Sequence, residues 1–197
     1  MNRYTIIGLV VGFVLGLFVG TQMPRGGSSS APSAAMPPQP MPQMPQMPGP
    51  PPGADVELQG RIAMNQAIVA RDPKNVQVWI QLGNDYFDSH QAQKAVEAYG
   101  RALELRPNDP NVLTDQGVMY RALGQFDKAI SNFEKANRAD PKHVQSLFNM
   151  GVVYANDLKK PKEATQAWSR VIQVAPQSEQ AAAARAGIEE LKATATK

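Results

Sequence analysis

The chain repeats itself every 34 or 35 residues from Asp55 onward, and this period limits the possible folds more than any other feature of the sequence. Four series of residues recur in phase. They are Gly83, Gly117 and Gly151; Tyr86, Tyr120 and Tyr154; Tyr99, Phe133 and Trp168; and Pro73, Pro107, Pro141 and Pro176. Units of this length stack on their neighbours, because a single unit cannot bury its own apolar face. The period therefore predicts a repeat protein.

The first unit indicates which kind of repeat this is. Its residues Trp79, Leu82, Gly83, Tyr86, Ala95, Tyr99, Ala102 and Pro107 match the pattern of the tetratricopeptide repeat family. In the second unit Leu113 and Gln116 replace the expected Trp and Leu, and the third unit has one extra residue in its inter-helix turn near Lys159. About half of the chain resembles this family, and the resemblance implies a helix, a tight turn and a second, antiparallel helix in each unit.

The resemblance thus implies an all-α fold, a right-handed α-solenoid of three helix hairpins with flanking helices. The three units are expected at residues 76–109, 110–143 and 144–177, with helices near 75–88, 92–105, 110–122, 126–139, 143–156 and 162–174. A helix at 56–71 belongs to a half-repeat over residues 55–75, and a capping helix with a tail occupies residues 178–197. Solenoid ends need such closure to stay soluble.

Small residues predict where the helices approach one another. We expect Gly83 to face Ala95 across the first hairpin, since overpacking such a contact costs about 1–3 kcal/mol. The large rings of Tyr99, Phe133 and Trp168 are then expected to fill the space between units.

The first 23 residues predict a transmembrane anchor. The stretch from Tyr4 to Met23 carries no charge, and at about 1.5 Å per residue it covers a hydrocarbon core of about 30 Å. A cleaved secretory signal is the alternative, because Arg3 gives an apolar run a positive start. The charges favour an exported, periplasmic body over a cytoplasmic one, which stays open. Glycines that share one helical face and favour self-association are Gly8, Gly12, Gly16 and Gly20.

Residues 24–54 predict a disordered linker rich in Pro, Met and Gln. Eleven of the 17 prolines lie between Pro24 and Pro52, so polyproline II is expected rather than helix or sheet. Its three residues per turn place Met41, Met44 and Met47 along one edge. Because thioethers are soft ligands for Cu(I), copper binding by this linker is one alternative function, beside that of a simple tether.

The composition argues against most catalytic chemistry. The chain has no cysteine and only two histidines, His90 and His143, which disfavours thiolate sites, histidine metal sites and catalytic triads. Neither a glycine-rich phosphate loop nor a nucleophile elbow occurs. From Asp55 onward 18 basic side chains face 17 acidic ones, without the surplus that nucleic acid requires. We expect no enzyme, no cofactor and no nucleic-acid partner.

In this family the first helix of each unit lines a concave groove, and the resemblance implies a peptide-binding surface of twelve residues. They are Gln77, Ile80, Asn84, Phe87, Asn111, Thr114, Val118, Arg121, Gln145, Phe148, Val152 and Asn156. Most are apolar, aromatic or amide side chains, and Arg121 is the single cation among them. Family members that clamp a terminal carboxylate use Lys, Asn and Arg here, and only Asn84 matches. An extended or helical apolar peptide is the expected ligand, unless the flanking helices cover the groove.

The layout of anchor, linker and repeats resembles that of membrane-anchored envelope proteins that help to assemble c-type cytochromes or other exported complexes. The expected function is that of a membrane-tethered, non-enzymatic adaptor that binds a protein or peptide client. A homo-oligomeric scaffold that captures no client is the alternative of a different class.

Overall fold

The computed structural model describes residues 54–195, and this part of the chain is helical throughout, without strands. Its elements are α1 (Ala54–Arg71), α2 (Val76–Asp88), α3 (Ala92–Leu105), α4 (Pro110–Ala122), α5 (Phe126–Ala139), α6 (Val144–Val152), the π-helical segment η1 (Val153–Asp157), α7 (Pro161–Val174) and α8 (Glu179–Ala195). The prediction of an all-helical stack is confirmed. The predicted anchor with its four glycines and the linker with Met41, Met44 and Met47 lie outside the described residues.

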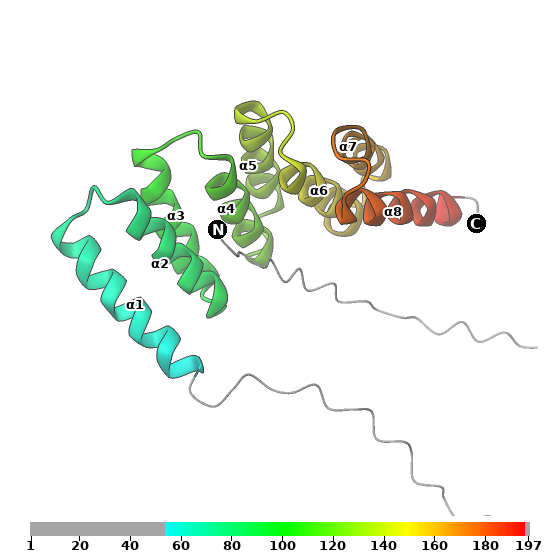
Figure 1. Cartoon of the computed structure of the whole chain (residues 1–197). Coiled ribbons are helices and arrows are strands. Elements are labelled where there is room, and N and C mark those ends of the chain that lie inside the picture. The colour runs from blue at the N-terminus through cyan, green and yellow to red at the C-terminus, as the bar shows by residue number, and fades with distance from the viewer. Residues whose placement is uncertain (1–53, 196–197) are drawn as a thin grey trace, which may run out of the picture. The chain divides into compact units, whose positions relative to one another are not determined.

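The helices pack in chain order (Figure 1). Helices α2 and α3, α4 and α5, and α6 and α7 form three antiparallel hairpins, and each second helix also contacts the first helix of the next hairpin. Helix α1 packs on α2 at one end of the stack, and α8 packs on α7 at the other. Within residues 54–195 no helix combines the length and the hydropathy that crossing a bilayer requires.

Each hairpin begins with a side-chain cap. Asn75 accepts a hydrogen bond from the backbone N–H of Val78 at the start of α2, and Asp109 caps α4 in the same way. His143 caps α6 through its Nδ1 atom, which accepts from the Ser146 N–H. These caps satisfy N–H groups that have no partner inside the helix, so they fix where the first helix of each unit starts.

The glycine of each hairpin faces a large ring and not the predicted alanine. A Cβ atom on Gly83 would lie 2.5 Å from the Tyr99 ring, and one on Gly117 would lie 2.5 Å from the Phe133 ring. The rings therefore pack against the glycine of their own hairpin, where Ala95 was expected opposite Gly83. They also reach the next unit as predicted, because Tyr99 shares a core cluster with Val112 and Met119 of α4, and Phe133 shares one with Val153 of η1. Trp168 does both, because it packs on Gly151 of α6 and also on Gly187 of α8.

The extra residue of the third unit lies in η1 and not in the turn. The turns of the three hairpins contain His90, Gly124 and Lys159, each with a positive φ angle. Each of these residues is two positions before the next helix, but the preceding glycine is seven residues away in the first two units and eight in the third. A π-helical turn holds one residue more than an α-helical turn, so η1 absorbs the insertion and leaves the turn unchanged.

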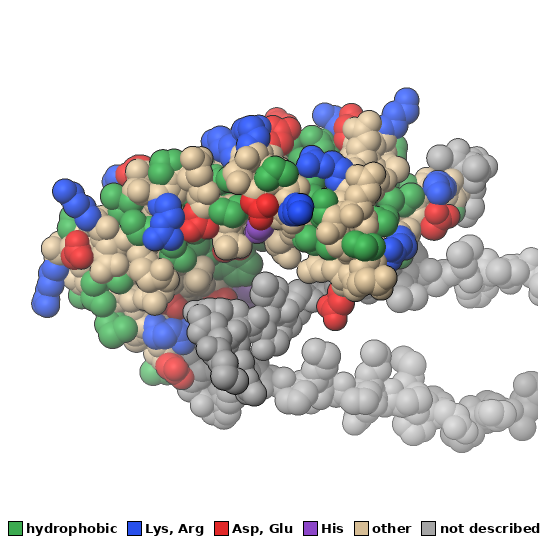
Figure 2. All heavy atoms as spheres, turned by 45° about the horizontal axis from the view of Figure 1, so that its top comes forward, with side chains coloured by type: hydrophobic (Ala, Val, Ile, Leu, Met, Phe, Trp, Pro, Cys, Tyr) green, Lys and Arg blue, Asp and Glu red, His purple; other side chains and the backbone are tan. Residues whose placement is uncertain are grey.

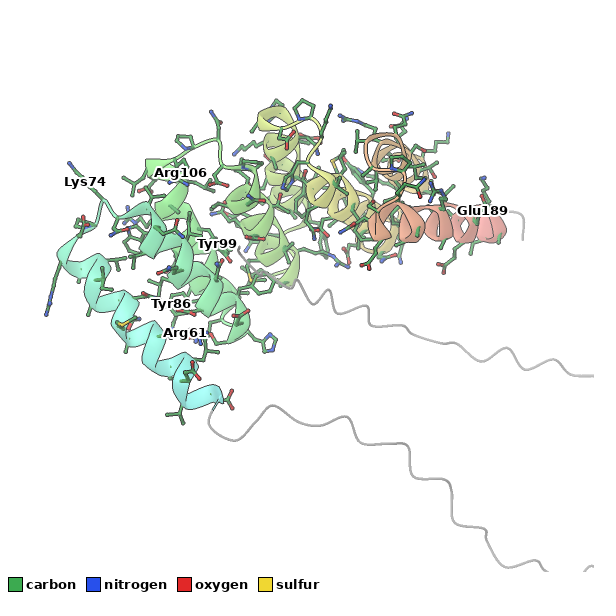
Figure 3. The ribbon with its side chains drawn as sticks, viewed as in Figure 1. Arg61, Lys74, Tyr86, Tyr99, Arg106 and Glu189 are labelled. Atoms are coloured by element: carbon green, nitrogen blue, oxygen red, sulfur yellow. The ribbon has the colours of Figure 1, made fainter. Side chains whose placement is uncertain are left out.

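Polar contacts hold α1 against α2. Asp85 of α2 is buried, and its carboxylate accepts from Arg61 Nε at 3.0 Å and from Asn65 Nδ2 at 2.9 Å. Gln66 donates to the Tyr86 hydroxyl at 2.7 Å. Figure 3 shows Arg61 and Tyr86 where these two helices meet. Arg61 and Asn65 differ from the family pattern because they neutralise and satisfy a carboxylate that burial would otherwise destabilise.

Candidate peptide-binding surface

The predicted groove residues come from α2, α4, α6 and η1, and their spacing of three or four residues puts each set on one face of its helix. The exposed ones are Gln77, Asn84, Asn111 and Asn156. The half-buried ones are Ile80, Phe87, Val118, Arg121, Gln145, Phe148 and Val152. Thr114 alone is fully buried. The structure therefore leaves eleven of these side chains with some contact to solvent.

Thr114 offers nothing to a ligand. Its side chain is 1% exposed, and its hydroxyl donates to the backbone carbonyl of Pro110 at 2.7 Å. The His143 ring from α6 lies 3.5 Å away on the other side. Thr114 thus packs between α4 and α6, and its assignment to the groove lining was wrong.

Arg121 is not a free cation. Its guanidinium forms an ion pair with the Asp157 carboxylate, to which both Nε and Nη2 donate. Asp157 is the last residue of η1, so this pair links the second hairpin to the π-helical turn of the third. The positive charge that the sequence suggested for this surface is balanced within the protein.

Two of the predicted amides already accept hydrogen bonds from the protein. The Tyr99 hydroxyl donates to Asn84 Oδ1 at 2.8 Å. Asn111 Oδ1 lies 3.1 Å from His143 Nε2, and this nitrogen carries the proton because Nδ1 accepts from the Ser146 N–H. The amide N–H groups of Asn84 and Asn111 remain available, so these residues can still donate to a peptide carbonyl.

The apolar side chains form the part of the surface best suited to a peptide. Ile80, Phe87 and Val118 pack with one side on the core around α2 and α3 and keep the other side partly exposed. Phe148 and Val152 do the same on the core around α6 and α7. Half-buried side chains of this kind are already ordered, so a ligand that covers them loses little conformational entropy on their account.

Two carboxylates near this surface were missing from the prediction. Burial raises the pKa of Asp115 on α4 to about 6, with a smaller contribution from the charge of Asp109. Burial also raises the pKa of Asp88 on α2, against the opposing effect of Arg61. Burial, followed by the charges of Asp115 and Asp88, raises the pKa of the Tyr99 phenol, whose hydroxyl bonds Asn84. This end of the surface is acidic.

Two hollows of similar volume lie elsewhere. One, of about 550 Å³, is formed by α5, α6, η1 and α7, and the other, of about 540 Å³, by α1, α2 and α3. None of the twelve predicted residues lines either hollow. On the face shown in Figure 2, basic and acidic side chains are interspersed. No group of three or more acidic or histidine side chains suited to a metal ion occurs within residues 54–195.

Comparison with known proteins identifies the type of fold. Models described as tetratricopeptide repeat match residues 74–142 and residues 114–181, a span that includes all three hairpins. The small glutamine-rich tetratricopeptide repeat-containing protein 2 of Mycosarcoma maydis is 30% identical over 97 residues, which cover 49% of this chain. The match spans only 27% of that protein's own length.

Two solved structures show the same arrangement of helices. The crystal structure of MamA has a TM-score of 0.62 at 18% identity, and the likeness covers 71% of this chain and 85% of that one. The first TPR of Spaghetti (RPAP3), solved bound to the HSP90 peptide SRMEEVD, has a TM-score of 0.57 at 20% identity and covers 62% and 94%. At these identities the likeness establishes the fold alone.

Proposed function

Because the chain belongs to the tetratricopeptide repeat family, we propose that its stack of hairpins is a non-enzymatic adaptor that binds a peptide segment of a client protein. The family fold is a protein-interaction module, and one structural neighbour was solved with a peptide bound. The observation that carries the proposal is the row of partly exposed apolar side chains across α2, α4 and α6, which includes Ile80, Val118 and Val152.

The charges favour a client without an acidic end. A carboxylate would meet Asp88 and Asp115 beside Asn84, and Arg121 cannot compensate because Asp157 neutralises it. Ile80 also brings no donor where a carboxylate clamp needs one. We infer an apolar peptide that donates hydrogen bonds, or places a basic residue, near Asp115. This chemistry differs from that of the acidic peptide SRMEEVD.

Selection of a displayed random peptide library on the full chain is expected to yield apolar peptides with few acidic residues. Ile80→Gln removes apolar contact area from the surface, so we expect it to weaken the selected peptides about tenfold, or about 1.4 kcal/mol. Fluorescence anisotropy with labelled peptides measures this change. SRMEEVD serves as the acidic reference and is expected to bind more weakly than the selected peptides.

Val56→Gln is the matched control. Val56 is 76% exposed on α1 and is not among the predicted groove residues, so peptide affinity should stay at the wild-type value. Thermal melts of both variants separate lost binding from lost stability. Equal peptide affinity of Ile80→Gln and the wild type would place the binding surface elsewhere.

We also propose that residues 4–23 tether the adaptor to a membrane, with the repeats exported, and that the adaptor is an envelope assembly factor of the cytochrome c biogenesis type. The support is the uncharged stretch of twenty residues that precedes Arg25.

After cell fractionation, the full chain is expected in the membrane pellet and a variant lacking residues 1–23 in the supernatant. A variant lacking only the linker residues 26–52 should still pellet; a full chain found in the supernatant would contradict the proposal.

A further inference from the structure

The hollow formed by α5, α6, η1 and α7, here called the third-unit cleft, has an exact counterpart in the repeat register. The hollow formed by α1, α2 and α3, here the first-unit cleft, has nearly the same volume, about 540 against 550 Å³. Tyr86 and Tyr154 occupy the same position of their units in the two clefts. Differences between the two clefts therefore show what each can bind.

In the first-unit cleft two polar side chains of the protein contact Tyr86. Gln66 donates a hydrogen bond to the Tyr86 hydroxyl at 2.7 Å, and Lys94 Nζ lies 5.5 Å from the centre of the Tyr86 ring. The second unit repeats the second contact, with Lys128 Nζ 5.4 Å from the centre of the Tyr120 ring. A cation over this face of the tyrosine is thus a regular feature of the repeat.

In the third-unit cleft both donors are replaced by carboxylates. Glu134 stands two repeats after Gln66, and Glu163 stands in the position of Lys94 once the extra residue of η1 is counted. Both glutamates line the cleft together with Tyr154. Burial, followed by the charges of these two glutamates, raises the pKa of the Tyr154 phenol, so both carboxylates act on this ring.

Asn137, beside the two glutamates, carries a buried acceptor without a protein donor in the described part of the chain. Asn137 lines the cleft and is 8% exposed, and its Nδ2 atom donates to the Phe133 carbonyl at 3.2 Å. Its Oδ1 atom is buried and has no hydrogen-bond partner within the described residues. Buried acceptors are nearly always satisfied by protein or by ordered water, so this enclosed oxygen is suited to a bound water molecule.

Two arginines also line the third-unit cleft, but neither stands at the repeat position that Lys94 and Lys128 occupy in the other units. Arg138 reaches Glu134 at 3.9 Å, one turn along α5, in a pair of exposed side chains that binds weakly. Arg170 has no ion pair within the described residues, and its equivalent in the first-unit cleft is Arg101. Arg101 pairs with Glu104 at 2.9 Å while Lys94 lies over Tyr86, so the first-unit cleft holds an arginine and a cation over the ring together.

We propose that the third-unit cleft binds a lysine or arginine side chain of a partner polypeptide, whose charged group lies over the Tyr154 ring and pairs with Glu163 and Glu134. The incoming cation takes the place that Lys94 and Lys128 fill in the other two units. It gives Glu163, which has no ion pair within the described residues, a partner, and it gives Glu134 a nearer one than Arg138 at 3.9 Å. The volume exceeds that of one side chain, which leaves room for adjacent residues of the same polypeptide. This site is separate from the proposed groove.

The test uses the full chain labelled with nitrogen-15 and, as the probe, Nα-acetyl-lysine methylamide. The amide signals of Tyr154 and Glu163 are expected to shift as the probe is added, and the neutral norleucine analogue should leave them unchanged. Glu163→Lys restores the lysine of the other units, so it should abolish the response without unfolding the chain. Glu163→Gln should weaken the response at least threefold, and Glu190→Lys, an equal change of charge on the exposed face of α8, should leave it intact.

Four outcomes would overturn the assignment. The norleucine analogue could shift the same signals, which would make the cleft a simple apolar site. Inorganic phosphate in place of the lysine probe could shift them, which would make the two arginines the binding groups. An unchanged response of Glu163→Lys would move the lysine to another place. Shifts of these signals with protein concentration, matched by self-association in ultracentrifugation, would assign the cleft to a second copy of this chain.

Discussion

Replacing Gly117 with leucine is expected to lower the free energy of unfolding by about 3 kcal/mol, the largest loss that we expect from a single substitution. A Cβ atom at this position would lie 2.5 Å from Cε1 of Phe133. Phe133 is 0% exposed, so its ring has no free space to move into, and relief requires that α4 and α5 separate. The cost of such overpacking exceeds the gain of about 1 kcal/mol that leucine brings over glycine inside a helix. Urea denaturation followed by circular dichroism measures the difference.

The same substitution on α1 provides the control. Gly60 is exposed, and a Cβ atom there would meet nothing within 4 Å. Gly60→Leu is therefore expected to raise the free energy of unfolding by up to about 1 kcal/mol, since only the helix propensity changes. If both variants shifted the urea midpoint in the same direction, the close contact between Gly117 and the Phe133 ring would not be the determinant of stability that the structure indicates.

The fold could be predicted because all three units share the same period of 34 or 35 residues. Each hairpin repeats the same glycine, tyrosine and proline, so one correct register places all helices. The predicted limits agree with the structure to within two residues when η1 is counted as the end of α6. The sequence could not predict in the same way which of the recurring residues contact one another. Equal intervals do not say whether Gly83 faces Ala95 or Tyr99, because that depends on how the two helices cross.

The spacing of recurring residues gives the position of the extra residue in the third unit but not the structure that this residue adopts. The distance from Gly151 to Lys159 is one residue longer than the matching distances in the other units, so the sequence does locate the insertion before the turn. It does not show that the added residue is absorbed as a π-helical turn. In the structure the N–H of Leu158 donates to the carbonyl of Val153, five residues earlier, and this bond closes the π-helical turn.

The candidate site was predicted less well than the fold for a related reason. Register assigns a residue to a helical face, but it does not show which partners from other helices reach it. Arg121 is paired with Asp157, 36 residues further along the chain, and Thr114 is enclosed by α6. Asp115 lies in register with Gln81 and Asn149, which are not among the predicted groove residues, so the repeat pattern did not indicate it.

Asp115→Asn is expected to raise the free energy of unfolding by about 2 kcal/mol at pH 7.5, the second large effect. The folded state holds the pKa of Asp115 at about 6, above its ordinary value of 3.8, because burial disfavours the charged form. The folded chain thus binds more protons than the unfolded chain between these values, and the wild type loses stability as the pH rises from about 4 to above 6. Two pKa units correspond to about 3 kcal/mol, which partial exposure reduces. Asparagine is neutral at every pH and avoids this loss.

The pH dependence distinguishes this cause from a general effect of the substitution. At pH 4 the folded wild type carries Asp115 in its neutral form, so the two chains should melt at nearly the same temperature, while Glu190→Gln should show no gain at either pH. A gain of equal size at both values would contradict the role of the buried charge. Proteins keep such destabilising groups where function requires them. If a basic residue of the client pairs with Asp115, the asparagine variant will be the more stable protein and the weaker binder, and thermal melts and anisotropy on the same samples will show both changes together.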